Sequence, residues 1–173
     1  MELLDHLTQE HRKVEELLGT LASSDEGPAR EATLAELESS LSTHMAVEET
    51  FLYPLVTKVI GAEDEEEAEV EHGLARDGVA KLRELVAEPG FGAAVDMVTA
   101  GIGHHVKEEE QELFPQLRAE AADQVRALGT PDELEAKVKS KSELYDQAKD
   151  AGVRGRSRMS KDELAEAVGD TKS

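Results

Sequence analysis

Two stretches of the sequence repeat one arrangement of side chains that is able to bind a metal ion. HMAVEETFLYP begins at His44 and carries Glu48 four residues later, and HVKEEEQELFP begins at His105 and carries Glu109 at the same spacing. Positions i and i+4 lie on one face of an α-helix, so each histidine and its glutamate reach a common point. Neutral imidazole and carboxylate groups are ligands of divalent cations, and the repeated pair therefore predicts a metal site.

Two further histidines extend this pattern. His11 and His72 each take a place in a helical series of apolar residues, and they are 61 residues apart. The same offset relates Glu10 to Glu71, His44 to His105, Glu48 to Glu109, Glu49 to Glu110, Tyr53 to Phe114, and Pro54 to Pro115. The repeat indicates that one helical hairpin is used twice, so we expect a domain with an approximate two-fold axis.

Apolar residues at steps of three or four predict four amphipathic helices. The four segments are residues 4–21, 34–59, 68–86 and 91–116. Turn-forming sequences such as SSDEGP separate them, and we expect Pro54 and Pro115 to kink or end the second and fourth helices. Four long helices with short connections predict an all-α protein whose residues 1–128 form an up-down-up-down four-helix bundle.

The histidines and glutamates lie on the faces that such a bundle buries, near its mid-height. Plain ion pairs there would be costly, because desolvation costs several kcal/mol per ion and a domain is stable by only about 5–15 kcal/mol. Bound cations remove this conflict, and mixed nitrogen and oxygen ligands suit iron, manganese or zinc. We predict one metal at His11 and His44 and one at His72 and His105, with Glu48 and Glu109 bridging them.

The composition limits other roles. The 173-residue chain has no cysteine, which excludes thiolate metal ligands. Residues 1–130 carry 29 acidic and 10 basic side chains, a net charge of −19, whereas residues 131–173 carry 10 and 9. An acidic bundle repels phosphate backbones and anionic membranes, so we expect neither as its partner. The chain shows no signal-peptide pattern and no apolar run of about 18 residues, and we expect a cytoplasmic location.

The combination of these motifs resembles the hemerythrin-like, HHE cation-binding family over about residues 1–128. The carriers of the resemblance are the first-helix and third-helix histidines and the two His-x-x-x-Glu elements, each followed by an aromatic residue and proline. The resemblance implies a centre of two iron ions (Fe2+/Fe3+) with a bridging oxo or hydroxo group, which binds dioxygen, peroxide or nitric oxide. The ligands it implies are His11, His44, Glu48, His72, His105 and Glu109.

One position departs from the oxygen-carrying members of that family. They have a second histidine four residues after the third-helix ligand, and this chain has Arg76 there. The place related to Arg76 by the 61-residue offset is Glu15, which is either a surface residue or an additional carboxylate ligand. The missing histidine favours peroxide chemistry, of a catalase-like or other oxidoreductase kind, or sensing, over reversible oxygen carriage. A non-enzymatic iron-responsive or iron-holding protein is the alternative.

Apolar residues one turn from the histidines are expected to form a small pocket that suits diatomic ligands, or to be ordinary core residues. These residues are Val14, Leu41, Ala75 and Ile102. Two other histidines, His6 and His104, lie off the apolar series and are expected to face solvent.

The last part of the chain has a different character. We predict a linker over residues 129–141 and a short helix, basic link and helix over residues 142–173, with the second helix opened by a capping box at Ser160 and Glu163. This arrangement resembles small SAP-like and Rho-N-terminal-like modules, some of which contact nucleic acid. Alternatively, its apolar residues form a small core or dock on the bundle. Under the nucleic-acid interpretation the protein is a DNA-associated adaptor.

Overall fold

The computed structural model describes residues 2–138, 152, 163–164 and 167. The chain divides into two compact units, Met1–Pro131 and Asp132–Ser173. Residues 131–138, within the segment that we predicted as a linker, form a helix, which begins at Pro131 and has acidic residues in its first turn. The predicted tail helices, their capping box and the basic link lie almost entirely outside the described residues.

The elements of the first unit are all helical, and the described residues contain no strand. They are α1 (Leu3–Ala22), α2 (Pro28–Val47), η1 (Glu48–Leu52), α3 (Tyr53–Val59), α4 (Glu63–Glu84), α5 (Phe91–Glu108), η2 (Glu109–Leu113), α6 (Phe114–Glu120) and α7 (Ala122–Leu128). The two η elements are single π-helical turns.

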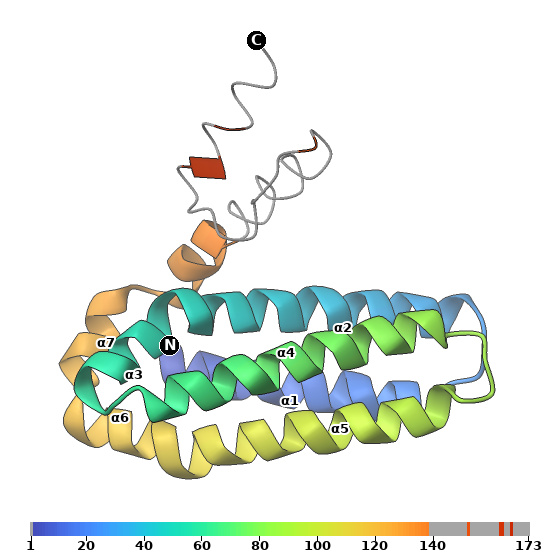
Figure 1. The fold of residues 1–173 in the computed structure, drawn as a ribbon, viewed down its shortest axis with the longest axis horizontal. Coiled ribbons are helices and arrows are strands. Elements are labelled where there is room, and N and C mark those ends of the chain that lie inside the picture. The colour runs from blue at the N-terminus through green and yellow to red at the C-terminus, as the bar shows by residue number, and fades with distance from the viewer. Residues whose placement is uncertain (1, 139–151, 153–162, 165–166, 168–173) are drawn as a thin grey trace. The chain divides into compact units, whose positions relative to one another are not determined.

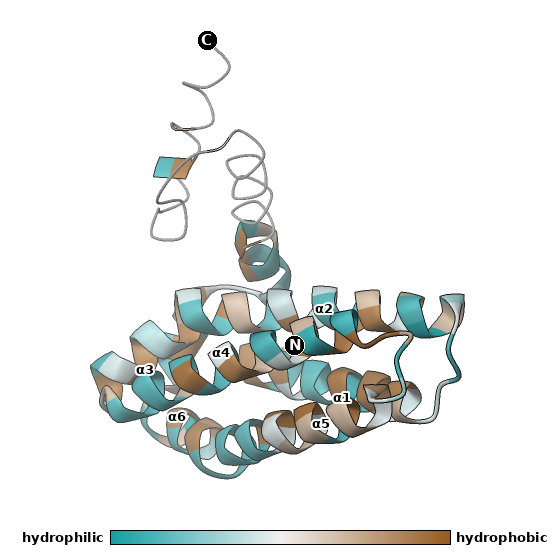
Figure 2. Ribbon diagram, turned by 45° about the vertical axis from the view of Figure 1, so that its right-hand side comes forward, coloured by the Kyte–Doolittle hydropathy of each residue, from teal (hydrophilic) through white to brown (hydrophobic). Residues whose placement is uncertain are grey.

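The four long helices α1, α2, α4 and α5 lie side by side, and α3, α6 and α7 gather at one end (Figure 1). Each long helix packs against two others, in the cyclic order α1, α2, α4, α5. Figure 2 shows hydrophilic and hydrophobic residues alternating along these helices. The all-α, up-down-up-down four-helix bundle is therefore confirmed.

The apolar series predicted from the sequence are the buried faces of the helices. In α1 the buried residues are Leu3, Leu4, Leu7, His11, Val14, Leu18 and Leu21. A continuous apolar cluster fills the bundle on one side of the histidines, and it includes Leu18, Leu37, Leu82 and Val95. On the other side, the buried residues include Leu7, Leu52 and Phe114. The histidines thus lie between two apolar layers of the core.

The second and fourth long helices do not simply kink at their prolines. Each widens into a π turn, in which the backbone N–H of Tyr53 donates to the carbonyl of Glu48 and that of Phe114 donates to Glu109. The following residues, Pro54 and Pro115, have no N–H to continue the α-helical pattern. Each π turn begins at a site glutamate, Glu48 or Glu109, and single π turns of this kind are frequent at functional sites.

The packing of the core predicts that two leucines of α4 contribute very differently to the stability of the protein. Leu82 is fully buried, whereas Leu74 is 66% exposed. We expect Leu82→Ala to lower the free energy of unfolding by about 2–5 kcal/mol and Leu74→Ala by less than about 0.5 kcal/mol. Urea denaturation at a fixed metal content measures both values. Equal losses in the two variants would contradict the packing described here.

Candidate metal centre

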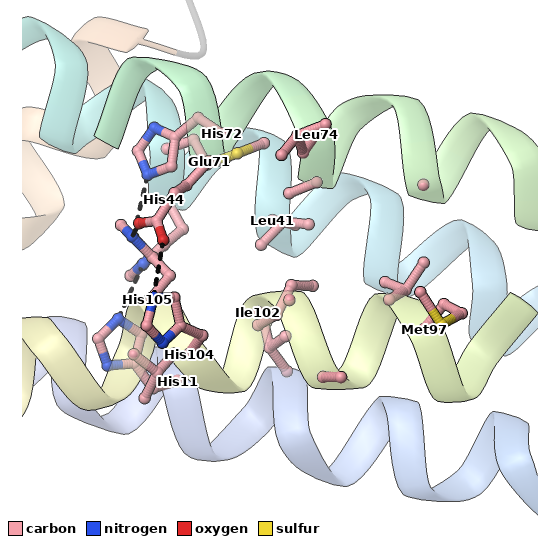
Figure 3. Close-up of a pocket in the computed structure, with 18 residues that line it drawn as sticks. His11, Leu41, His44, Glu71, His72, Leu74, Met97, Ile102, His104 and His105 are labelled. Carbon is pink, nitrogen blue, oxygen red and sulfur yellow. Dashed lines mark hydrogen bonds and ion pairs between the residues drawn. The ribbon is translucent and has the colours of Figure 1, made fainter. Parts of the chain in front are cut away.

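Four histidines, one from each long helix, meet in the middle of the bundle. His11 and His44 form one pair and His72 and His105 the other, and in each pair the two Nε2 atoms are 3.1 Å apart. All four side chains are buried. Figure 3 shows the imidazoles grouped at one level of the bundle, as the sequence predicted.

Two buried carboxylates connect the histidine pairs. The Oε1 atom of Glu48 is 3.1 Å from Nε2 of His44, and its Oε2 atom is 3.4 Å from Nε2 of His72. The Oε2 atom of Glu109 is 3.2 Å from Nε2 of His11 and 3.7 Å from Nε2 of His105. Each carboxylate therefore contacts one histidine of each pair, which is the arrangement expected of bridging ligands.

Three of the four inner carboxylate oxygens have no hydrogen-bond partner. Both oxygens of Glu48 and Oε2 of Glu109 are buried without one. An unsatisfied buried polar atom costs about 1–3 kcal/mol, and more when it is charged. The ligand atoms form two groups within 4.8 Å, one of His11, His44, Glu48 and Glu109 and one of Glu48, His72 and His105. Orphaned oxygens beside inward-facing imidazole nitrogens fit the donor set that a pair of cations requires.

An outer ring of carboxylates holds the imidazoles from behind. The Nδ1 atoms of His11, His44, His72 and His105 lie 2.8, 3.2, 2.9 and 2.7 Å from Glu110, Glu10, Glu49 and Glu71, respectively. An Nδ1–H that donates to a carboxylate leaves the Nε2 lone pair facing the centre, and metal-bound histidines commonly have this support. We did not predict this role from the sequence, although these four glutamates obey the 61-residue repeat.

Two arginines hold part of the outer ring. Arg12 pairs with Glu110 and with Glu15, and Arg76 pairs with Glu49. Arg76 therefore stands where a fifth histidine would stand but lies at the solvent-exposed side of the outer ring. The structure does not bring Glu15 to the centre, because its half-exposed carboxylate pairs with Arg12.

The other two histidines lie outside the inner cluster. His104 is 61% exposed beside Glu108, as expected. His6 is 18% exposed, so it faces solvent only in part, and it lies 3.7 Å from Glu10 of the outer ring.

One residue pair breaks the two-fold symmetry. The hydroxyl of Tyr53 donates to Oε1 of Glu109 at 2.7 Å. Its repeat partner Phe114 has no hydroxyl and stacks on His11, with ring centroids 5.9 Å apart. Burial, followed by the charges of Glu109 and Glu48, raises the pKa of Tyr53, which keeps the hydroxyl protonated as a donor. Glu109 therefore has one oxygen fixed by Tyr53, whereas both oxygens of Glu48 face the histidines.

The charge of each inner group depends on the charges of its neighbours. Burial opposes the charge of His44, but its interactions with Glu48, Glu10 and Glu109 together outweigh burial and raise the pKa of His44 well above 6.5. Burial acts against the charge of Glu48 too, yet His44 and His72 together hold the pKa of Glu48 well below 4.5. For His72, burial is outweighed by its interactions with Glu48 and Glu49, which raise its pKa to about 9. Without cations, protons would therefore neutralise the cluster.

A cavity of about 430 Å³ adjoins the histidines on one side. Its lining includes all four of the imidazoles and the four apolar residues that we expected near them: Val14, Leu41, Ala75 and Ile102. The cavity lies toward the α4 and α5 side of the bundle, since most of its lining comes from these two helices. A small molecule can therefore reach the histidines through this cavity.

The fold and the centre define a helical-bundle protein with a cation-binding site. Residues 2–117 match the family described as Hemerythrin HHE cation binding domain, and the chain belongs to that family. The chain is also 25% identical over 154 residues to a protein of a Nostoc species named DNA nickase. The match covers 88% of this chain but only 44% of that protein, so the chain spans less than half the length of this relative. Among the described residues, no helix has the length and apolar character to cross a membrane.

The coupled charges predict how pH affects the metal-free protein. The folded pKa of His72, about 9, exceeds its ordinary 6.5, so its contribution to stability is complete below pH 6.5 and is lost as pH rises toward 9. The folded pKa of Glu48 is below its ordinary 4.5, so its contribution is present above pH 4.5 and is lost as pH falls. We expect the free energy of unfolding of chelator-treated protein to be highest between these limits.

Urea denaturation across this pH range measures the profile. His72→Gln is expected to flatten its alkaline side, whereas His104→Gln, at an exposed position, leaves it unchanged. A metal-free stability that increases from pH 6.5 to 9 would contradict the interactions assigned to His72.

The outer ring predicts a further effect, on metal affinity. Glu71 lies 2.7 Å from Nδ1 of His105, whereas Glu69 is exposed on the same helix. We expect Glu71→Gln to weaken zinc binding about 10–100-fold, because loss of a carboxylate behind a ligating histidine has this effect. Glu69→Gln is the matched control and should bind zinc like the wild type. Competition with a chromophoric chelator measures the affinities, and equal affinity of both variants would remove the role assigned to the outer ring.

Proposed function

We propose that this protein is a non-haem di-iron protein that binds a small ligand, either dioxygen, peroxide or nitric oxide. The observation that carries the proposal is the set of three orphaned inner carboxylate oxygens, which face four imidazoles already oriented from behind. His11, His44, Glu48, His72, His105 and Glu109 would hold the two metals. Membership of the HHE cation-binding family supports a metal function.

The nitrogen and oxygen donors would accept iron, zinc or manganese. We propose iron because of the resemblance to the hemerythrin-like family. When bound in the ferrous state, a pair of irons would supply two electrons, one from each metal, to a small ligand. The symmetry of the ligands, with Glu48 and Glu109 each near both histidine pairs, favours two metals over one.

The protein's own residues would then control access and orientation. The outer carboxylates fix the imidazole rings, and Tyr53 holds one oxygen of Glu109. Among the described residues, none adds a fifth histidine ligand to the centre. Arg76, at the place of that histidine, pairs with Glu49. The cavity reaches the histidines, so a small molecule can approach a centre that has fewer protein ligands than oxygen carriers have. This arrangement favours peroxide decomposition or ligand sensing over clean oxygen release.

Adjacent histidines of α5 provide the direct test of the site. We expect two irons per chain after anaerobic loading with Fe2+, and near-ultraviolet absorption of an oxo-bridged ferric pair after exposure to air. His105→Gln removes a buried inner side chain and should lose iron and absorption, whereas His104→Gln alters an exposed neighbour and should keep both. Metal analysis and absorption spectra measure these outcomes. Full iron content in His105→Gln, or none in the wild type, would overturn the proposal.

Addition of ligands to the loaded protein separates catalysis from sensing. Decomposition of two hydrogen peroxide molecules to one dioxygen and two waters is the expected catalase-like reaction, and an oxygen electrode detects it. An iron-responsive protein would instead lose much of its stability on chelation without turning over peroxide.

The DNA nickase of Nostoc favours a second candidate function, contact with DNA. The aligned 154 residues exceed the length of the bundle unit, so the similarity continues past Pro131. The bundle itself carries a net charge of −19 and should not bind phosphate, whereas residues 131–173 hold 9 of the 19 basic side chains.

The DNA function predicts binding that depends strongly on salt. Lysine and arginine contacts to phosphate release counterions, so the affinity of the full chain for duplex DNA should fall steeply between about 50 and 200 mM salt. Fluorescence anisotropy measures the affinity, and conversion of supercoiled plasmid to the open circle measures nicking. Absence of both at low salt would remove this candidate.

A further inference from the structure

The cavity beside the histidines is larger than the proposed small ligands need. Its volume is about 430 Å³, whereas a water molecule occupies about 30 Å³ of liquid. Cavities of 300–1,000 Å³ are typical of sites for organic molecules. A diatomic ligand or hydrogen peroxide would therefore leave most of this space unfilled.

The shape of the cavity is elongated along the bundle. Its lining on α5 extends from Val106 to Met97, a separation that corresponds to about 14 Å of helix. Figure 3 shows the imidazoles at one end, Leu41 and Ile102 in the middle and Met97 at the other end. The cavity is thus polar at the histidine end and apolar along its length.

The cavity opens to the surface between α4 and α5. Leu74 and Met97 belong to its lining and are 66% and 75% exposed, so they place apolar surface at its opening. At the far end Gly78 brings the two helices together, because a Cβ atom at this position would lie 2.7 Å from Cγ2 of Val98. At Gly101, by contrast, a Cβ atom would meet nothing within 4 Å.

The charges around the cavity determine what kind of head group it accepts. No lysine or arginine is among the described residues that line it, and Glu71 is the acidic group at its histidine end. Without bound metal, a buried carboxylate or sulfate would have no lysine or arginine to pair with, and the surrounding domain is strongly acidic. An uncharged molecule meets neither penalty.

We propose that the cavity between α4 and α5 binds a linear, uncharged aliphatic molecule, with a small oxygen head at the histidines and its alkyl chain along Leu41, Ile102 and Met97. The ligand class includes medium-chain alcohols, aldehydes and hydroperoxides. This inference goes beyond the proposed iron function, because it depends on the walls of the cavity and holds for the metal-free protein. Failure of iron chemistry and failure of this binding are therefore separate results.

The test uses the full-length, chelator-treated protein, in which neither redox chemistry nor ligation of the head group by a metal ion contributes. Titration with the neutral fluorophore N-phenyl-1-naphthylamine, followed by displacement with n-alcohols of increasing length, gives the relative affinities. Each added methylene is expected to tighten binding about fourfold until the cavity is filled, after which the gain stops. The alcohol should bind at least tenfold more tightly than the fatty-acid anion of the same chain length.

Matched variants locate the binding. Gly101→Leu places a side chain in the lining and should weaken alcohol binding at least tenfold, whereas Gly103→Leu makes the same change at an exposed position of α5 outside the lining. A second pair on α4 is Leu74→Gln, at the opening, and Val70→Gln, which is equally exposed but does not line the cavity. Circular dichroism establishes that each variant is folded.

Three results would each overturn the proposal: no displacement by any alcohol, equal affinity for alcohol and carboxylate, or equal effects of Gly101→Leu and Gly103→Leu. A chain-length dependence that is lost only in the lining variants supports it.

Discussion

The burial of four imidazoles and two carboxylates is the constraint on which the rest of this structure depends. A four-helix bundle is stabilised by apolar faces, and six ionisable groups in its middle layer oppose that stabilisation unless their charges are balanced. Here the six groups face each other, three inner oxygens have no hydrogen-bond donor, and a ring of glutamates orients every imidazole. Such an arrangement is costly as a plain ion-pair network and favourable as a cation site. Membership of the HHE cation-binding family agrees with this interpretation.

The internal repeat explains how one chain builds the centre. Each half supplies two histidines, one inner glutamate, two outer glutamates and one π turn, all related by 61 residues. Residues that depart from this symmetry are candidates for a functional role, because they make the two halves of the centre different. Tyr53 fixes one oxygen of Glu109, whereas Phe114 leaves both oxygens of Glu48 facing the histidines. The large cavity adds a further asymmetry, because it opens between α4 and α5.

The sequence predicted the four long helices and the meeting of the six inner residues, because helical periodicity and the i, i+4 spacing determine which side chains share a face. It did not predict the π turns, since a proline indicates that the α-helix is disturbed but not how. The sequence also did not determine the role of Glu15, because its negative charge suits both a metal ion and Arg12. The position of the side chain in the structure shows that it pairs with Arg12. The outer glutamates were visible in the repeat, but hydrogen bonds across helices require the relative rotation of those helices.

The family and the buried donors support a cation-binding protein, and its action on a small ligand is our proposal. Anomalous diffraction from crystals of the iron-loaded protein, at the iron absorption edge, tests the central claim most directly. Our account predicts two iron peaks in the middle of the bundle, one bound by His11 and His44 and one by His72 and His105, with Glu48 and Glu109 between them. A bundle of iron-replete protein with no peak among these side chains would contradict it.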